Sequence, residues 1–252
     1  MYDLQKPNMW KRIAAALLDF FVLIIVASAV FLALLGILNL NKHSTEFQLR
    51  CDEYEQKYGI DLDMSGDDYR ALDEDGKKAY ESAADGLATD EAANYHFSMI
   101  LNITLIAVTV GFIIAYLLTD FIIPLIFKNG QTLGKKAFGI AVMREDGVKV
   151  SAIHMFARSI LGKCTIETIV PVFIVIMIFF ELMGTVGVIV LLGFALLQLA
   201  LLIINKTRTP IHDLLAHTVA VDLNSQMIFD SPEEMLEYKK AKHAEKAERA
   251  DR

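Results

Sequence analysis

The sequence predicts an all-α membrane protein with four transmembrane helices, a small helical extracytoplasmic insertion and a short cytoplasmic β-hairpin. Hydrophobic residues make up 54% of the 252 residues and the mean hydropathy is +0.42, although 22% of residues are charged. The charged residues lie outside several long apolar stretches, and a membrane-spanning helix needs ~20 apolar residues. Lysine and arginine gather in some connecting segments and acids in another, which places these segments on opposite sides of a membrane.

The N-terminal region, residues 1–40, contains the first predicted span at 13–40. Arg12 precedes the apolar stretch and Asp19 lies inside it. We expect this helix to be retained, because it holds an acid and lacks the cleavage pattern of a signal peptide. The two charges are seven residues apart and therefore share one helix face. Charges in such a helix are costly and mark a candidate functional site, and the alanines at 14–16 allow another segment to approach this face.

Residues 41–96 form the predicted extracytoplasmic insertion. Tyrosines and leucines recur there at near-helical spacing, so we expect a small helical unit. Residues 61–67 match the first half of a calcium-binding loop, but Leu72 stands where the loop requires a bidentate glutamate. An acidic turn between helices is therefore the preferred interpretation, and no metal site is predicted.

The second predicted span, residues 97–127, contains Asp120 and Pro124. The apolar region from 164 to 204 is too long for one helix across a ~30 Å core. It divides near Glu181, which gives a third and a fourth span within residues 165–204. The alternative is a single span with an additional interfacial segment.

A cytoplasmic region is predicted at residues 128–164. Two short strands around the turn at Asp146 predict a β-hairpin, and residues 218–222 could add a third strand. Residues 152–163 form an amphipathic segment, expected to lie in the membrane interface. Four basic residues either contact lipid phosphates or anchor the inner face: Lys135, Lys136, Arg158 and Lys163.

The last regions are a cytoplasmic segment with an aspartate and a strand, residues 205–230, and a charged helix, residues 231–252. Ser231 and Glu234 form a capping box that predicts the start of this helix. The segment 39–96 holds fifteen acids and six basic residues, whereas 128–164 holds two acids and seven basic residues. Both termini are therefore expected in the cytoplasm. The chain has no basic stripe with interleaved aromatics, so no nucleic-acid partner is expected.

Several short motifs in order resemble the RDD family of bacterial integral membrane proteins, which is named for one arginine and two aspartates. They comprise Arg12 and Asp19, the stretch GQTLGKKAFGIAV at 130–142, and Asp213 within TPIHDLLAHT at 209–218. The resemblance implies a multi-pass protein of the bacterial cell membrane. It also implies a polar cluster of Arg12, Asp19 and Asp213 and, because some members look like exchangers, transport of monovalent cations against protons.

Other functions compete with transport. The same cluster could be a structural brace in a non-transporting scaffold or assembly factor, acting as a homo-oligomer or with a membrane protein partner. Asp120 and His212 are secondary site candidates, and an Asp19–Asp120 hydrolase dyad is a third alternative. No enzyme is expected, because the chain lacks H-E-x-x-H and G-x-S-x-G motifs. No cofactor is predicted, and His212 and His217 do not complete a metal site of known spacing.

Overall fold

The computed structural model describes residues 4–179, 181–204 and 209–250. The chain divides into two compact units, one of residues 1–25 and 115–252 and the other of residues 26–114. Within the described residues, four helical stretches are long and apolar enough to cross a membrane: Met9–Ile37, Glu91–Ile126, Ala152–Ile178 and Gly184–Leu201. The predicted all-α membrane architecture with four spans is therefore confirmed.

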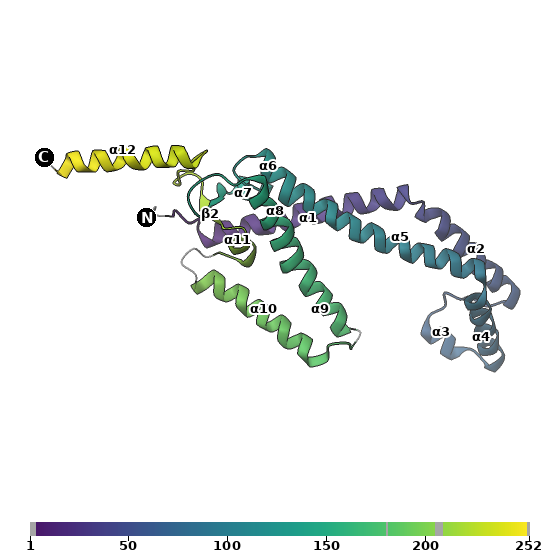
Figure 1. Cartoon of the computed structure of the whole chain (residues 1–252). Helices are drawn as coiled ribbons and strands as arrows, with labels where there is room; N and C mark the ends of the chain where they lie inside the picture. The colour runs from purple at the N-terminus through teal and green to yellow at the C-terminus, as the bar shows by residue number, and fades with distance from the viewer. Residues whose placement is uncertain (1–3, 180, 205–208, 251–252) are drawn as a thin grey trace. The chain divides into compact units, whose positions relative to one another are not determined.

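The α-helices of the four spans are labelled in Figure 1, and two of the spans also contain wider, π-helical turns. The first span is helix α1 (Met9–Ile37), and the fourth is α10 (Gly184–Ile204). The second consists of α5 (Glu91–Tyr116), η1 (Leu117–Ile122) and α6 (Ile123–Ile126). The third consists of α8 (Ala152–Phe156), η2 (Ala157–Ile169) and α9 (Val170–Phe179). The turns of η1 and η2 are the π-helical ones, and such turns often occur at functional sites.

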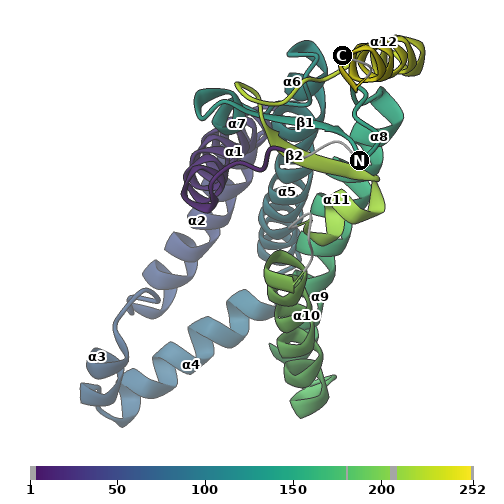
Figure 2. The ribbon, with the colours of Figure 1, turned by 90° about the vertical axis from the view of Figure 1, so that its left-hand side faces the viewer.

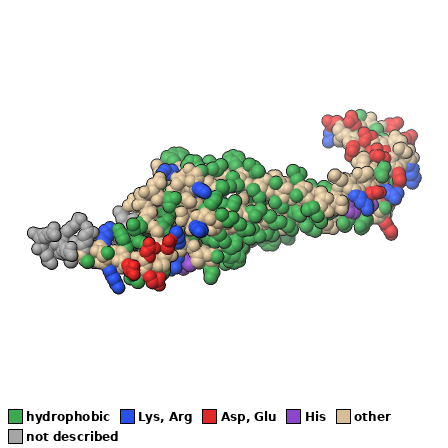
Figure 3. Space-filling model, turned by 90° about the horizontal axis from the view of Figure 1, so that it is seen from above, with side chains coloured by type: hydrophobic (Ala, Val, Ile, Leu, Met, Phe, Trp, Pro, Cys, Tyr) green, Lys and Arg blue, Asp and Glu red, His purple; other side chains and the backbone are tan. Residues whose placement is uncertain are grey.

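The unit of residues 26–114 contains the helical insertion that the sequence predicts. It consists of α2 (Leu40–Tyr58), α3 (Gly66–Ala71) and α4 (Glu74–Thr89), and acidic side chains gather over it in Figure 3. The acidic turn before α3 is held locally, because Asp61 Oδ1 accepts a hydrogen bond from the Asp63 amide at 2.8 Å and Ser65 caps α3. Asp61 therefore stabilises the turn, and the Ser65 hydroxyl is the helix cap.

The other unit contains a two-stranded antiparallel sheet of β1 (Ile140–Arg144) and β2 (Thr218–Asp222) (Figure 2). The predicted hairpin turn is present, since the Arg144 amide donates to the Val148 carbonyl at 2.9 Å. The returning arm, however, is not a regular strand of the sheet, and its pairing with β1 is an isolated bridge between Met143 and Lys149. The regular partner of β1 is β2, which lies more than seventy residues further along the chain.

The N-terminal segment is fastened to this sheet. The Asp222 amide donates to the Gln5 carbonyl at 2.8 Å, and Lys11 Nζ pairs with Asp222 Oδ2 at 2.9 Å. Leu4 packs against a small core of four buried residues from the two strands: Ala141, Met143, Val219 and Val221. The start of α1 is thereby held against the segment that follows the last span.

Three further helices complete this unit. Helix α7 (Leu133–Ala137) precedes β1, and α11 (Ile211–Leu215) precedes β2. Helix α12 (Pro232–Ala250) begins at the predicted capping box, where the Glu234 amide donates to Ser231 Oγ at 3.2 Å. Residues 205–208 and 251–252, which belong to the last two predicted regions, lie outside the described residues.

The third span differs from its prediction. We expected an interfacial helix at 152–163 and a span within 165–204 that begins after it, but one continuous helix runs from Ala152 to Phe179. The expected boundary came from Arg158 and Lys163, which interrupt the apolar pattern. Both side chains form ion pairs with aspartates, so the helix continues through them instead of ending in the interface. Contact of Arg158 with lipid phosphates is excluded by its burial.

Candidate functional site

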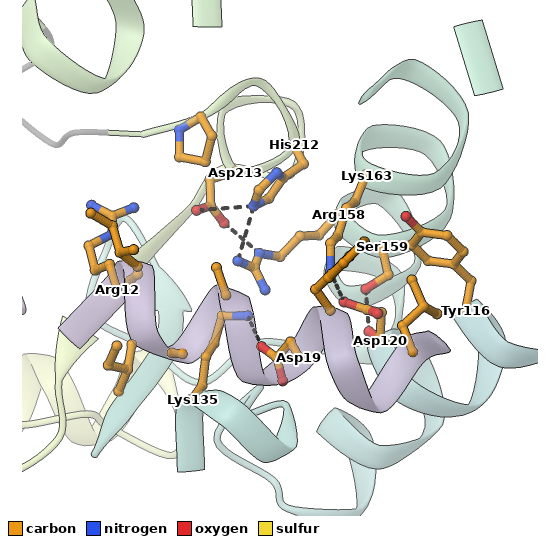
Figure 4. A pocket seen from close by; sticks show the side chains of 18 of the residues that line it. Arg12, Asp19, Tyr116, Asp120, Lys135, Arg158, Ser159, Lys163, His212 and Asp213 are labelled. Atoms are coloured by element: carbon orange, nitrogen blue, oxygen red, sulfur yellow. Dashed lines mark hydrogen bonds and ion pairs between the residues drawn. The ribbon is translucent and has the colours of Figure 1, made fainter. Parts of the chain in front are cut away.

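A pocket of about 430 Å³ lies within the unit that contains both chain ends (Figure 4). Helix α1 forms one wall, and α5, η1, η2, α7, α11 and both strands contribute further side chains. Both acidic and basic residues line it. The acids are Asp19, Asp120 and Asp213, and the basic residues are Arg12, Lys135, Arg158 and Lys163.

Asp19 is bound mainly by uncharged donors. Its carboxylate accepts a hydrogen bond from Thr132 Oγ1 at 2.5 Å and another from the Gly134 amide at 2.7 Å. Lys135 Nζ stands 3.7 Å away and is closer to Thr132 Oγ1, at 3.3 Å. Asp19 is only 8% exposed. Two hydrogen bonds from neutral donors and the more distant Lys135 ammonium therefore stabilise its carboxylate in the pocket wall.

Small residues allow α7 to reach this carboxylate. A Cβ on Gly134 would lie 2.2 Å from the backbone oxygen of Ala15, which is too close for any side chain there. Ala15 itself is buried against Ile140 and Ala220 of the two strands. The close approach to the alanine face that the sequence predicts is therefore made by α7.

Asp213 forms a buried contact ion pair. Arg158 Nε donates to Asp213 Oδ1 at 2.5 Å, and Thr218 Oγ1 donates to the same oxygen at 2.9 Å. The two charged side chains are only 6% and 1% exposed. Burial raises the pKa of Asp213, but the Arg158 guanidinium outweighs this effect and holds that pKa well below its usual range.

Asp120 forms the second contact ion pair, with Lys163 Nζ at 2.5 Å. Thr119 Oγ1 donates to its other oxygen at 2.9 Å, and Ser159 donates to its backbone carbonyl. Asp120 lies on η1, and Lys163 and Ser159 lie on η2. The π-helical turns of the second and third spans therefore face each other through this pair.

His212 joins the third span to the segment after the fourth. Its ring Nδ1 lies 2.7 Å from Glu167 Oε2, and its backbone amide donates to Glu167 Oε1 at 2.9 Å. Its other ring nitrogen, Nε2, faces Arg158 Nη2 at 3.3 Å and Asp213 Oδ2 at 3.6 Å. Gly162 permits this contact, because a Cβ there would stand 2.6 Å from His212 Cα.

All predicted site residues line this one pocket: Arg12, Asp19, Asp120, His212 and Asp213. Arg12 lies at one end of the pocket in Figure 4, and Asp213 is paired with Arg158. The partners of the three aspartates differ from the sequence-based prediction, which places Lys135, Arg158 and Lys163 at the lipid interface. A usable signal was present in the third span, where basic residues lead without a break into an apolar run. In the described part of the chain, no three metal-binding side chains come together.

A family model described as the RDD family matches residues 6–217, which covers most of the 252-residue chain. The chain belongs to the RDD family. The match includes the pocket-lining residues from Met9 to Asp213 and ends just before β2. The comparisons with curated proteins and with solved structures gave no match. In this RDD protein, the arginine and the two aspartates identified from the sequence therefore lie around a common pocket.

Proposed function

We propose that this RDD-family protein exchanges a monovalent cation for protons across the bacterial cell membrane, with Asp19 as the carboxylate that the cation contacts. One comparison of distances supports this assignment. Asp120 and Asp213 hold their cationic partners at 2.5 Å, whereas Lys135 stands 3.7 Å from Asp19. Asp19 is thus the pocket carboxylate whose ionic partner a mobile cation can replace with the least disruption.

The other contacts of Asp19 suit such an exchange. Thr132 and Gly134 are neutral donors that hold the carboxylate in place whether or not a cation is bound. Coulomb attraction between unit charges strengthens several-fold from water to a partly buried site, so a small cation gains from a desolvated carboxylate. An intramembrane or membrane-boundary acid of this kind is typical of ion pathways.

In this proposal both termini and the sheet lie in the cytoplasm, and the acidic insertion of α2, α3 and α4 lies outside. The surplus of lysine and arginine in residues 128–164 supports that orientation. The pocket then opens at the inner end of the helices. The protein's partners in this proposal are the lipid bilayer, monovalent cations and protons. Its function is non-enzymatic and requires no cofactor.

Proton movement in vesicles tests the proposal. The purified full-length protein is reconstituted with a trapped pH dye, and sodium, lithium or potassium is added outside. The wild type should move protons with at least one of these ions, and Asp19→Asn should abolish the movement. Asp146→Asn is the matched control, because Asp146 lies in the exposed hairpin turn and pairs with Arg144 away from the pocket. A silent wild type overturns the exchange proposal.

A second candidate function is a membrane scaffold or assembly factor in which the pocket is a brace. One observation favours it: among the described residues, every buried side-chain nitrogen and oxygen has a hydrogen-bond partner. Satisfied networks of this kind rigidify a fold. In this case the exposed insertion or the sheet contacts a membrane protein or a second copy of the chain. Full activity of the wild type in the vesicle assay would exclude the scaffold as the only role.

A further inference from the structure

The contacts of His212 define the state of its ring. Guanidinium nitrogens can only donate hydrogen bonds, so His212 Nε2 must accept from Arg158 Nη2 at 3.3 Å. The ring proton therefore resides on Nδ1 and is donated to Glu167 Oε2 at 2.7 Å. In this arrangement His212 is neutral, and the lone pair on its Nε2 accepts the hydrogen bond from Arg158.

We propose that His212 is the residue at which a proton binds in the pocket, and that this proton opposes cation binding at Asp19. The effect on cation binding at Asp19 rests on the proposed exchange. The protonation of His212 does not. The proton site and the cation site of this pocket are thus different residues.

A proton on Nε2 changes the hydrogen bonds around it in a defined way. Protonated Nε2 becomes a donor and can no longer accept from Arg158, which lies 3.3 Å away and carries a like charge. Asp213 Oδ2, 3.6 Å away, is the acceptor that remains. Asp213 then pairs with His212 as well as with Arg158, and the Nη2 group of Arg158 loses its partner. The Nδ1–H bond to Glu167 is kept throughout.

Charged groups from several segments face the His212 ring. Glu167 contacts both the ring and the backbone amide, so the acid is fixed beside the ring. Glu167 also accepts a hydrogen bond from Gln198 of α10, which leaves its carboxylate oriented by two segments. The other charged groups that face the ring are Arg158, which opposes protonation, and Asp213, which favours it. Histidine is the side chain whose charge ordinarily changes between about pH 5 and 8.

The added charge acts on Asp19 through the pocket. Both residues line the same cavity of about 430 Å³, together with the cations Arg12, Lys135 and Lys163. One more positive charge there makes entry of a mobile cation less favourable, and loss of the proton makes it more favourable. Competition through the field of a shared pocket does not require the proton and the cation to occupy the same atom.

The protonation half is tested without any transport. Hydrogen–deuterium exchange at the histidine C2 position, followed by mass spectrometry, gives the protonated fraction of each histidine in the full-length protein in micelles. His212 should become protonated as the pH falls, and Glu167→Gln should make this happen at a lower pH, because an adjacent opposite charge is lost. His154 of α8, which bonds Ser151, serves as the internal control and should not change. A neutral His212 at pH 5, or a midpoint unaffected by Glu167→Gln, overturns the proposal.

The cation half is tested by thermal unfolding in sodium chloride against N-methylglucamine chloride at equal ionic strength. In the wild type, sodium should raise the melting temperature at pH 8 and have no effect at pH 5.5. His212→Gln should retain the sodium effect at both pH values, and His154→Gln should behave as the wild type. A sodium effect that disappears at pH 5.5 in His212→Gln overturns the coupling. If sodium, lithium and potassium all fail to stabilise the wild type at pH 8, the exchange proposal falls, and the C2 measurement still decides the protonation of His212.

Discussion

The Gly134 amide donates to Asp19 Oδ1 at 2.7 Å, and a Cβ on Gly134 would lie 2.8 Å from the same oxygen and 2.2 Å from the Ala15 carbonyl. We therefore expect Gly134→Ala to force α7 away from α1. Because the obstacle is backbone, the free energy of unfolding should fall by about 1–3 kcal/mol or more. Thermal unfolding in detergent measures this loss.

A control glycine separates this steric effect from a general effect of alanine. Gly193 lies in α10 with nothing within 4 Å of an added Cβ. Gly193→Ala should be neutral or stabilising, because alanine is the better helix former. Equal melting temperatures for Gly134→Ala and the wild type would show that α7 does not need its close approach to α1.

The buried pair of Arg158 and Asp213 provides a second prediction. Removing either charge alone leaves the other buried without its partner, at a cost of about 3–5 kcal/mol. Asp213→Asn and Arg158→Met should each destabilise the protein strongly. The double variant should be less destabilised than the sum of the two, and unfolding measurements on all four proteins give the coupling energy.

An exposed ion pair is the reference for that cycle. Arg70 and Asp67 of α3 are 2.8 Å apart, with side chains 79% and 90% exposed. The same cycle there should yield a coupling of at most about 1 kcal/mol. A coupling for Arg158 and Asp213 as small as that of the exposed pair would show that the buried pair does not brace the fold.

Lys135 predicts a pH dependence of stability. Burial lowers the pKa of Lys135 to about 8 from 10.5, and the charge of Arg158 adds to the effect. The folded protein therefore binds fewer protons than the unfolded chain between these values, so the free energy of unfolding should rise with pH from about 8 to 10.5. Lys135→Gln should remove this rise. Lys136→Gln, whose native amine lies over the Phe127 ring, should keep it, and an unchanged profile in Lys135→Gln would contradict the assignment.

Membrane topology gives a fourth prediction. Three spans separate Ser65 from Ser231, so the two residues should lie on opposite sides of the membrane. With Cys51 and Cys164 replaced, a single cysteine at Ser65 should react with an impermeant thiol reagent in intact cells. A cysteine at Ser231 should react only after permeabilisation. Labelling of the cysteine at Ser231 in intact cells would contradict the proposed orientation or the number of spans.

The spans and the identity of the family could be predicted because their signals are local. An apolar stretch of about twenty residues is set by bilayer thickness alone. Arg12, Asp19 and Asp213 were found because each belongs to a short motif. Their arrangement around one pocket agrees with the prediction of a polar cluster, whereas their roles stay predictions.

The partners of the aspartates could not be predicted, because the decisive information is tertiary. In the sequence, a lysine that anchors the inner face looks the same as a lysine that pairs with a buried acid, because both lie beside an apolar run. Only packing shows that Lys163 meets Asp120 and that Arg158 meets Asp213. A strand at residues 218–222 was predicted from the sequence, but its place as the regular partner of β1 was not, since the turn at Asp146 favours the local hairpin.

The long separation between paired residues has a consequence for biosynthesis. Asp19 is bound by Thr132 and Gly134, which lie 113 and 115 residues further along the chain. Arg158 likewise precedes Asp213 by 55 residues. On the ribosome, the first span therefore enters the membrane with an acid whose donors do not yet exist, and the third span enters before the partner of its arginine. The first span therefore keeps an acid without its hydrogen-bond donors until residues 132–134 are made, and the third span keeps an arginine without its partner until Asp213 is made.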